Sequence, residues 1–463
     1  MRTWPSVLIA LTAAAVGVAA WVFRPVEPEA ADTVDWTQTQ ALLQERGVSL
    51  SSKTNVVLAI VCTLRQDRLE PYGFEGPTSP FLDEMARTGV ILERHYTQAP
   101  WTRPSSGSLL TGRWPRALQL DNPGKRSSLS LVLDDSHTTL AEYFQAAGHT
   151  TIGSTGNPNL KAQFGLAQGL DLNWEPPNTF KEGHVRVKGH AQVDYLLDTL
   201  DTVPAEQPVF MQVVLTDTHT PRNPSLRYLR LLADSIFKPG RRARYNATVR
   251  QADAVLARLF TEVKAQRPDT LFVLANDHGE GLRHPRNHGR GHGNHLYPTT
   301  IGGTSIWHHP DLQPQRTDQL TMNIDLVPTI LGALGLPVGR VDGADLSDAM
   351  QGSEPFPNRS VVFSETYYGK TRKLSAIGPD FQYIRNQRVT KDPTRQEMLF
   401  ATSDRLSETN IIADHPEAAD RLRKALDAWD EQMGALWSSA GAPTEIELSA
   451  DTKAQLEALG YLD

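Results

Sequence analysis

The segment VVLAIV, Val56–Val61, is a continuous run of apolar, mostly β-branched residues. Such a run is typical of a β-strand that is buried on both faces. Similar runs recur at Val209–Leu215 and Leu271–Ala275, with helical patterns between them at 79–85, 139–147, 193–200, 245–263 and, further on, 324–334. Strands that alternate with helices predict an α/β fold in which a largely parallel sheet is covered by helices on both faces.

The pattern changes after Pro355. A strongly amphipathic helix is predicted near the end, with Leu422, Leu426 and Trp429 on one face. It follows three short strand-like pieces, separated by Gly and Pro, at Val361–Thr366, Lys373–Ile377 and Phe381–Arg385, and it spans Pro416–Trp437. These elements predict a small C-terminal α+β subdomain. We therefore expect a large α/β domain at 54–354 and the subdomain at 355–463.

The N-terminus carries an uncharged apolar stretch, Thr3–Phe23, preceded by Arg2. About 20 such residues suffice to span a bilayer, so we predict a signal anchor over 1–24. A cleaved signal peptide, with Val18-Ala19-Ala20 as the cleavage site, is the alternative, and a buried core helix is a third. The acidic, Pro- and Ala-rich residues that follow predict a linker over 25–53. The body of the protein is then extracytoplasmic, either membrane-anchored or, after cleavage, secreted or periplasmic.

Composition excludes several classes of protein. The 463 residues are 39% hydrophobic and 21% charged, which excludes a disordered chain, a collagen and a polytopic membrane protein. The net charge of −7 argues against a nucleic-acid-binding protein. A single cysteine permits no intrachain disulfide and no Cys-based zinc ribbon. Nothing in the sequence indicates the oligomeric state.

Polar residues follow three of the predicted strands. Cys62-Thr63 follows the first strand, and the segments Asp217-Thr218-His219 and 276–280 (NDHGE) follow the other two. Ligand sites in open α/β sheets lie beyond the carboxyl ends of the strands. Seven of the 14 histidines fall between His278 and His309, which favours a metal or anion site. A solvated His-rich loop is the alternative.

A further segment, 101–112 (WTRPSSGSLLTG), predicts a short helix. Thr102 fits its N-cap, Pro104 its first turn and Gly112 its end. The helix by itself requires no function. A hydroxyl at a helix N-terminus, however, faces the positive end of the helix dipole, which stabilises an alkoxide and binds sulfate or phosphate oxygens.

Taken in order, these segments resemble the sulfatases and sulfatase-like hydrolases of the alkaline phosphatase superfamily. The motifs are 55–69 (NVVLAIVCTLRQDRL), 96–102 (YTQAPWT), 108–113 (SLLTGR), 217–221 (DTHTP), 276–280 (NDHGE), 291–297 (GHGNHLY), 325–329 (DLVPT) and 456–462 (LEALGYL). The resemblance extends from about Thr54 to the end of the chain.

The resemblance implies a large mixed sheet between helices, with a small C-terminal sheet domain. It also implies a divalent metal beside a nucleophile that attacks sulfur or phosphorus. Thr102 matches the nucleophile, and Asp277 and His278 match metal ligands. His219 matches the histidine that contacts the ester oxygen and helps the leaving group, and His292 matches the basic residue that neutralises the anion.

Two departures from the family pattern concern the chemistry. A sulfatase has Cys, oxidised to formylglycine, where this chain has Thr102, and Arg where it has Ser106. Formylglycine is therefore excluded at this position, and Arg103 or Arg113 is left as a replacement for the missing charge. Cys62 stands where the family has an acidic metal ligand, and Thr63 follows it.

These departures favour zinc over calcium as the divalent ion. Calcium requires six to eight oxygen ligands, whereas Cys, His and Asp are all suitable zinc ligands. We therefore predict a site of Cys62, Asp277 and His278, with Thr102 or Thr63 as a further oxygen.

Three functions remain open. The first is an exported hydrolase that cleaves sulfate or phosphate esters, with Thr102 as nucleophile beside the metal. The second is a catalytically impaired relative that binds an anionic ligand or a partner. The third, a lipid-headgroup transferase, is disfavoured because such enzymes carry several membrane spans.

Overall fold

Strand β1 (Asn55–Val61) lies inside a nine-stranded sheet, and all seven of its residues are buried. Its neighbours are the parallel strands β5 (Val209–Leu215) and β6 (Thr270–Asn276). The strand order is β11-β2-β10-β6-β1-β5-β3-β4, with β9 paired to β2. The remaining bounds are β2 Val90–Tyr96, β3 Thr150–Thr155, β4 Leu172–Trp174, β9 Gly302–Gly303, β10 Ser305–His308 and β11 Gln315–Met322. Since only β9 and β10 pair antiparallel with their neighbours, the predicted mixed, mostly parallel sheet is confirmed.

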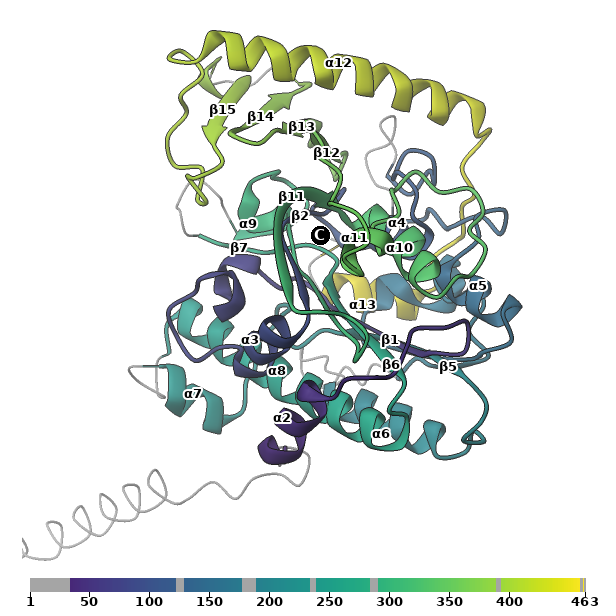
Figure 1. Ribbon diagram of the computed structural model, residues 1–463. Coiled ribbons are helices and arrows are strands. Elements are labelled where there is room, and N and C mark those ends of the chain that lie inside the picture. The colour runs from purple at the N-terminus through teal and green to yellow at the C-terminus, as the bar shows by residue number, and fades with distance from the viewer. Residues whose placement is uncertain are drawn as a thin grey trace, which may run out of the picture.

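Helices cover both faces of this sheet in the computed structural model (Figure 1). Alternate residues of β1 belong to two separate apolar cores: Val57, Ala59 and Val61 to one, Val56, Leu58 and Ile60 to the other. The first core lies under α2 (Trp36–Gln44), α3 (Pro80–Thr88), α6 (Gly189–Leu200) and α8 (Arg241–Gln266), and the second under α4 (Thr102–Thr111), α5 (Leu140–Ala146) and α10 (Leu326–Ala333). The predicted α/β layering is therefore present.

The structure describes residues 34–121, 129–176, 189–233, 239–283, 290–388, 393–458 and 461. The predicted anchor or signal peptide at 1–24 lies outside these residues. Among the described helices, none has the length and apolar character needed to span a membrane.

Helix α2 falls within the segment that we predicted to be a linker. Asp35 caps it by accepting a hydrogen bond from the Gln38 amide, and Leu42 and Leu43 are buried. The Thr39 hydroxyl contacts that of Thr261 on α8 at 2.6 Å. This part of the predicted linker is therefore a helix packed on the body of the protein.

The C-terminal region contains a second sheet. Strands β12 (Val362–Thr366), β13 (Lys373–Ile377), β14 (Phe381–Asn386) and β15 (Glu397–Ala401) are antiparallel and consecutive. Helix α12 (Pro416–Ser439) runs across this sheet at the top of Figure 1. Its buried residues include Leu422, Leu426 and Trp429, the face that the sequence predicted. The small α+β unit is thus present, and its boundary at residue 355 remains a prediction.

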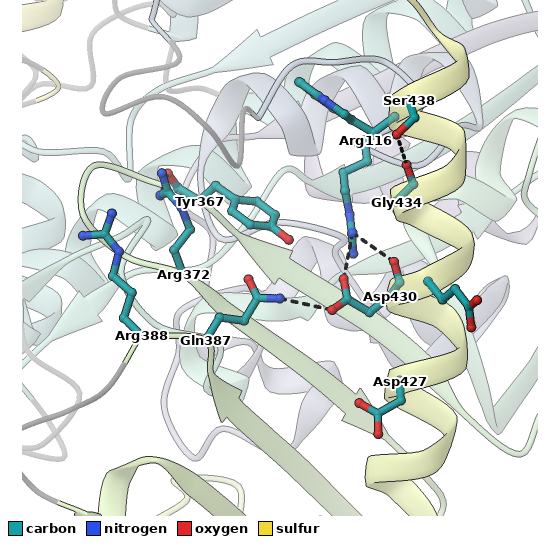
Figure 2. Close-up of a pocket in the computed structure, with 11 residues that line it drawn as sticks. Arg116, Tyr367, Arg372, Gln387, Arg388, Asp427, Asp430, Gly434 and Ser438 are labelled. Atoms are coloured by element: carbon teal, nitrogen blue, oxygen red, sulfur yellow. Dashed lines mark hydrogen bonds and ion pairs between the residues drawn. The ribbon is translucent and has the colours of Figure 1, made fainter.

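Arg116 joins this unit to the large domain. Its Nε lies 2.6 Å from Glu365 Oε2, and its Nη1 lies 2.8 Å from Asp430 Oδ1 on α12. Figure 2 shows Arg116 reaching α12 at the edge of a cavity of about 780 Å³. Because the cavity is lined by side chains of both signs, including Arg372 and Asp427, its walls do not form a single charged patch.

After α12 the chain returns to the large domain. The backbone amide of Ile446 donates to Ser130 O, and that of Val132 donates to Thr444 O. Helix α13 (Ala450–Ala458) then lies away from α12, near the centre of Figure 1. The end of the described chain therefore packs on the large domain rather than on the small sheet.

Acid is expected to destabilise the fold in part through His95. Burial lowers the pKa of His95 to about 4, whereas the unfolded chain takes up this proton near pH 6.5. The folded state thus binds fewer protons between pH 6.5 and 4, and stability falls with pH in that window. At pH 5 the loss from this residue is about 2 kcal/mol relative to pH 7. Urea unfolding at both pH values should show a smaller difference for His95→Gln.

The matched control is His415→Gln, which removes an exposed histidine. It should keep the wild-type difference between pH 7 and pH 5. The same difference in all three proteins would contradict the role assigned to His95.

Candidate active site

The ends of β1 and β6 bring Cys62, Asp277 and His278 together. Val61 and Asn276 are register partners, so the residues that follow them emerge side by side. One ligand atom from each of the three residues lies within 4.8 Å of the others, and all three side chains are buried. Asp277 Oδ2 has no hydrogen-bond partner. A buried carboxylate oxygen without a partner favours a cation at this point.

Thr63 holds this strand end in a strained conformation. Its φ of 60° lies in the left-handed region, which is unfavourable for a β-branched residue. The amide of Thr63 donates to Asp277 Oδ1 at 3.0 Å, and its hydroxyl donates to the Cys62 carbonyl at 2.6 Å. The strain therefore turns a backbone donor toward the Asp277 carboxylate. The Thr63 hydroxyl also lies 3.4 Å from Thr218 Oγ1, and its part in a metal site stays a prediction.

Thr102 lies beside these three residues. The sequence predicted Thr102 as the N-cap of its helix, but Trp101 has the extended backbone of the N-cap and Thr102 is the first helical residue. The Thr102 hydroxyl is therefore not the capping group of this helix. Thr102 Oγ1 lies 3.2 Å from His278 Nε2 and 3.8 Å from Cys62 Sγ. The predicted nucleophile and the predicted metal ligands thus form one cluster.

The backbone sets the tautomer of His278. Its Nδ1 lies 2.8 Å from the Gly279 carbonyl, so Nδ1 carries the proton and Nε2 carries the lone pair. Nε2 faces Thr102 Oγ1 and lies 3.4 Å from Asp277 Oδ2. Burial lowers the pKa of His278, which keeps the ring neutral and able to act as a ligand or proton acceptor.

The rings of His219 and His292 lie next to each other at the site, beside His278. Their ring centroids lie 5.1 Å apart, and His292 also lies 4.6 Å from the ring of His278. His219 Nδ1 contacts the Thr220 carbonyl at 2.6 Å, which leaves the lone pair on Nε2. Burial, together with the neighbouring His292, lowers the pKa of His219 to about 3.

Glu280 contacts His292 of this histidine pair. Its Oε1 lies 3.7 Å from His292 Nδ1, and its Oε2 accepts a hydrogen bond from Arg222 at 2.6 Å. Burial opposes ionisation of Glu280, but the neighbouring His292 and Arg222 outweigh it and lower its pKa to about 2. Glu280 is therefore an ionised carboxylate that lies against His292 and Arg222.

Neither arginine considered as a replacement for the family arginine faces the site. The guanidinium of Arg103 donates to the carbonyls of Leu129 and Leu131 and to Asn159 Oδ1. Arg113 pairs with Asp342 at 2.9 Å. Two other basic side chains, His292 and, through Glu280, Arg222, lie at the site.

Only some of the histidines between His278 and His309 lie at the candidate active site. Of its described members, His278 and His292 reach the site. His308 contacts the carbonyl of Leu43 on α2, and His309 pairs with Asp269. The clustering in sequence therefore overstated the number of histidines at the site.

Two site residues escaped the sequence analysis. Asn157 follows β3, and its Nδ2 donates to Cys62 Sγ at 3.3 Å and lies 3.4 Å from Thr102 Oγ1. The hydroxyl of Tyr461 lies 2.7 Å from Thr102 Oγ1. Asn157 could have been found as another polar residue beyond a strand end, but β3 (TTIGST) is too polar to resemble a buried strand. Tyr461 belongs to the quoted motif at 456–462, which gives no sign of its position.

The donor set fits a borderline metal ion better than calcium. Cys62 Sγ, Asp277 Oδ2 and His278 Nε2 offer sulfur, oxygen and nitrogen, a set of three that suits zinc with a fourth position open. Calcium would find a single carboxylate there. Burial, followed by the charge of Asp277, raises the pKa of the Cys62 thiol, so thiolate coordination requires a cation that displaces its proton.

The cavity of Figure 2 is separate from this cluster, because none of the six predicted site residues lines it. The predicted residues are Thr102, His219 and His292 for catalysis and Cys62, Asp277 and His278 for the metal. Five of them are instead buried at the carboxyl edge of the large sheet, and the partly buried His292 lies against them.

Comparison with known proteins gives a consistent result. A family model described as Sulfatase matches residues 54–336. Arylsulfatase A of Bos taurus is 25% identical over 392 residues, covering 74% of this chain and 76% of its own length. N-acetylgalactosamine-6-sulfatase of Canis lupus familiaris is 26% identical and covers 70% of each chain. The solved phosphonate monoester hydrolase of Agrobacterium radiobacter shares the fold, with a TM-score of 0.66 at 16% identity, covering 85% of this chain and all of its own.

Proposed function

Because the chain belongs to the sulfatase family, whose members named above are ester hydrolases, we propose that it cleaves sulfate or phosphate-type esters with Thr102 as nucleophile. The observation that carries this proposal is the position of Thr102 Oγ1, which lies 3.2 Å from His278 Nε2 within the cluster of candidate metal ligands that includes the unpartnered Asp277 Oδ2. The family's divalent metal would be held by Cys62, Asp277 and His278, and we propose zinc. Bound there, it supplies positive charge that stabilises an alkoxide and the developing charge on the ester oxygens.

The protein's own residues supply the remaining chemistry. The start of α4 directs its positive dipole end at Thr102, which lowers the cost of deprotonating that hydroxyl. His292, with Glu280 behind it, faces the anionic ester. His219, neutral and with its lone pair on Nε2, takes up the proton that Thr102 loses and passes it to the leaving oxygen. Attack by Thr102 Oγ1 breaks the bond between sulfur or phosphorus and that oxygen, and water then cleaves the ester formed on Thr102.

A second candidate is an impaired relative that binds an anion without turnover. The uncharged Ser106, which stands in place of the family arginine and is fully buried, favours this function. Loss of one anion-stabilising group typically slows turnover by about 10² to 10³-fold. The two candidates therefore differ in rate at the same site. The apolar segment Thr3–Phe23 supports an extracytoplasmic location for either, and we keep that location as part of the proposal.

Metal analysis together with an ester panel tests the proposal. We expect the purified protein to contain about one zinc per chain and to hydrolyse an aryl sulfate, a phosphate monoester or a phosphodiester. Chelation should abolish turnover and zinc should restore it. Asp277→Asn should lose both metal and activity, whereas Asp311→Asn, a change distant from the cluster near the His309 end of the sheet, should lose neither.

Stoichiometric calcium without a transition metal would contradict the assignment of zinc. Stoichiometric zinc without hydrolysis of any of the three esters would favour the anion-binding candidate instead.

A further inference from the structure

The last described residue, Tyr461, occupies the centre of the proposed active site. Its hydroxyl lies 2.7 Å from Thr102 Oγ1 and 3.5 Å from His219 Nε2. Its ring is stacked on that of His219 at 5.9 Å and lies 5.4 Å from that of His292. A single side chain therefore touches the proposed nucleophile, the leaving-group histidine and the anion-binding histidine.

The route of the chain to Tyr461 is held at several points. Lys161 Nζ donates to Gln455 Oε1 at 2.7 Å, and Gln163 Nε2 donates to Thr452 Oγ1 at 3.0 Å. Both hydrogen bonds tie α13 to the large domain. Tyr461 itself is buried with Leu456 in a small apolar cluster that also contains Trp101, the N-cap of α4. The position of the ring is thus fixed by packing as well as by its hydroxyl.

The position of the hydroxyl conflicts with that of a substrate. In a reactive complex the sulfur or phosphorus atom lies about 3 to 3.5 Å from the nucleophilic oxygen. The leaving oxygen lies on the opposite side of that atom, where His219 meets it. The Tyr461 hydroxyl already bridges Thr102 and His219, the two groups that have to flank the ester.

We infer that Tyr461 is an intramolecular competitor of the substrate, placed in the ester position by α13, and that an ester binds only after the phenol leaves. This inference rests on the proposed site. The apparent affinity for any ligand of that site is then reduced by the fraction of molecules in which Tyr461 has withdrawn. The chemical step, which takes place after withdrawal, is not slowed.

Three variants of the full chain test this inference, each with two measurements: KM and kcat for the best ester of the panel, and the dissociation constant of inorganic phosphate measured by calorimetry. Tyr461→Ala should lower KM and the phosphate dissociation constant by about 10-fold or more, with kcat unchanged or higher. Tyr461→Phe removes the hydroxyl alone and should lower both constants by about 2- to 10-fold, the worth of one hydrogen bond.

The third variant, Gln455→Ala, loosens α13 without touching the catalytic groups. It should shift both constants in the same direction by a smaller factor. Glu457→Ala, an exposed change on the same helix, is the matched control and should leave them unchanged.

The outcomes separate this inference from the proposed hydrolase function. Tighter phosphate binding in Tyr461→Ala, without hydrolysis by any variant, would uphold the competitor and reject the hydrolase. A loss of kcat in Tyr461→Phe with KM unchanged would overturn the inference, because it would make the phenol part of the chemistry. Unchanged constants in both Tyr461 variants would also overturn it.

Discussion

Thr102→Ala is expected to reduce kcat by about 10⁴- to 10⁶-fold, the range found when a hydrolase loses its nucleophile or a residue that acts with it. The Thr102 hydroxyl lies 3.2 Å from His278 Nε2 and 3.8 Å from Cys62 Sγ. Because Thr102 is not the N-cap of α4, its removal costs no capping bond. The stability loss should be limited to about 1 kcal/mol from the contact with Tyr461. Steady-state kinetics and urea unfolding measure the two effects separately.

Two controls accompany this variant. Thr111→Ala makes the same change on the same helix, where the hydroxyl donates to the Gly107 carbonyl, and it should leave turnover intact. Thr102→Ser keeps a hydroxyl and should retain measurable turnover. A folded Thr102→Ala protein with wild-type kcat would eliminate Thr102 as the nucleophile.

Cys62→Asp is expected to exchange the metal preference of the site. It replaces a soft sulfur by a hard oxygen, so zinc affinity should fall by more than about 100-fold while calcium affinity rises. Substituting only the groups that hydrogen-bond to metal ligands already costs about 10- to 100-fold in metal affinity. Without metal, the new carboxylate faces Asp277 in a buried site, and the apo variant should be less stable than the wild type. Isothermal titration with each ion and urea unfolding of the apo protein measure these effects.

Cys62→Ser is the matched control, because it removes the sulfur without adding a charge. It should weaken zinc binding and leave calcium binding negligible. Higher activity of Cys62→Asp with calcium would indicate a degraded calcium site. Unchanged zinc affinity in Cys62→Asp would show that Cys62 is not a ligand.

Sequence patterns predicted the fold well where burial determined composition. Strands β1, β5 and β6 are buried on both faces, so their apolar runs are unambiguous. The same three strands position the residues that follow them. For this reason, Cys62, His219, Asp277 and His278 could be placed at one edge of the sheet without coordinates.

What the sequence could not supply comes from less regular contacts. Strand β3 carries threonine, serine and glycine, so neither it nor the Asn157 beyond it was predicted. Tyr461 reaches Thr102 across 359 positions of the chain, through a helix whose packing has no local periodic signal. The N-cap of α4 was misassigned by one residue, because threonine is preferred at N-cap positions and tryptophan is not.

The central strand also has a consequence for how the protein is synthesised. β1 occupies residues 55–61, whereas its two neighbours end at residues 215 and 276. On the ribosome this apolar segment therefore emerges more than 200 residues before its second partner, while domains form as the chain lengthens. At about 5 to 20 residues per second, some 10 to 40 seconds pass before both neighbours of the strand have been synthesised. β1 is therefore a segment that a holding chaperone would protect during translation.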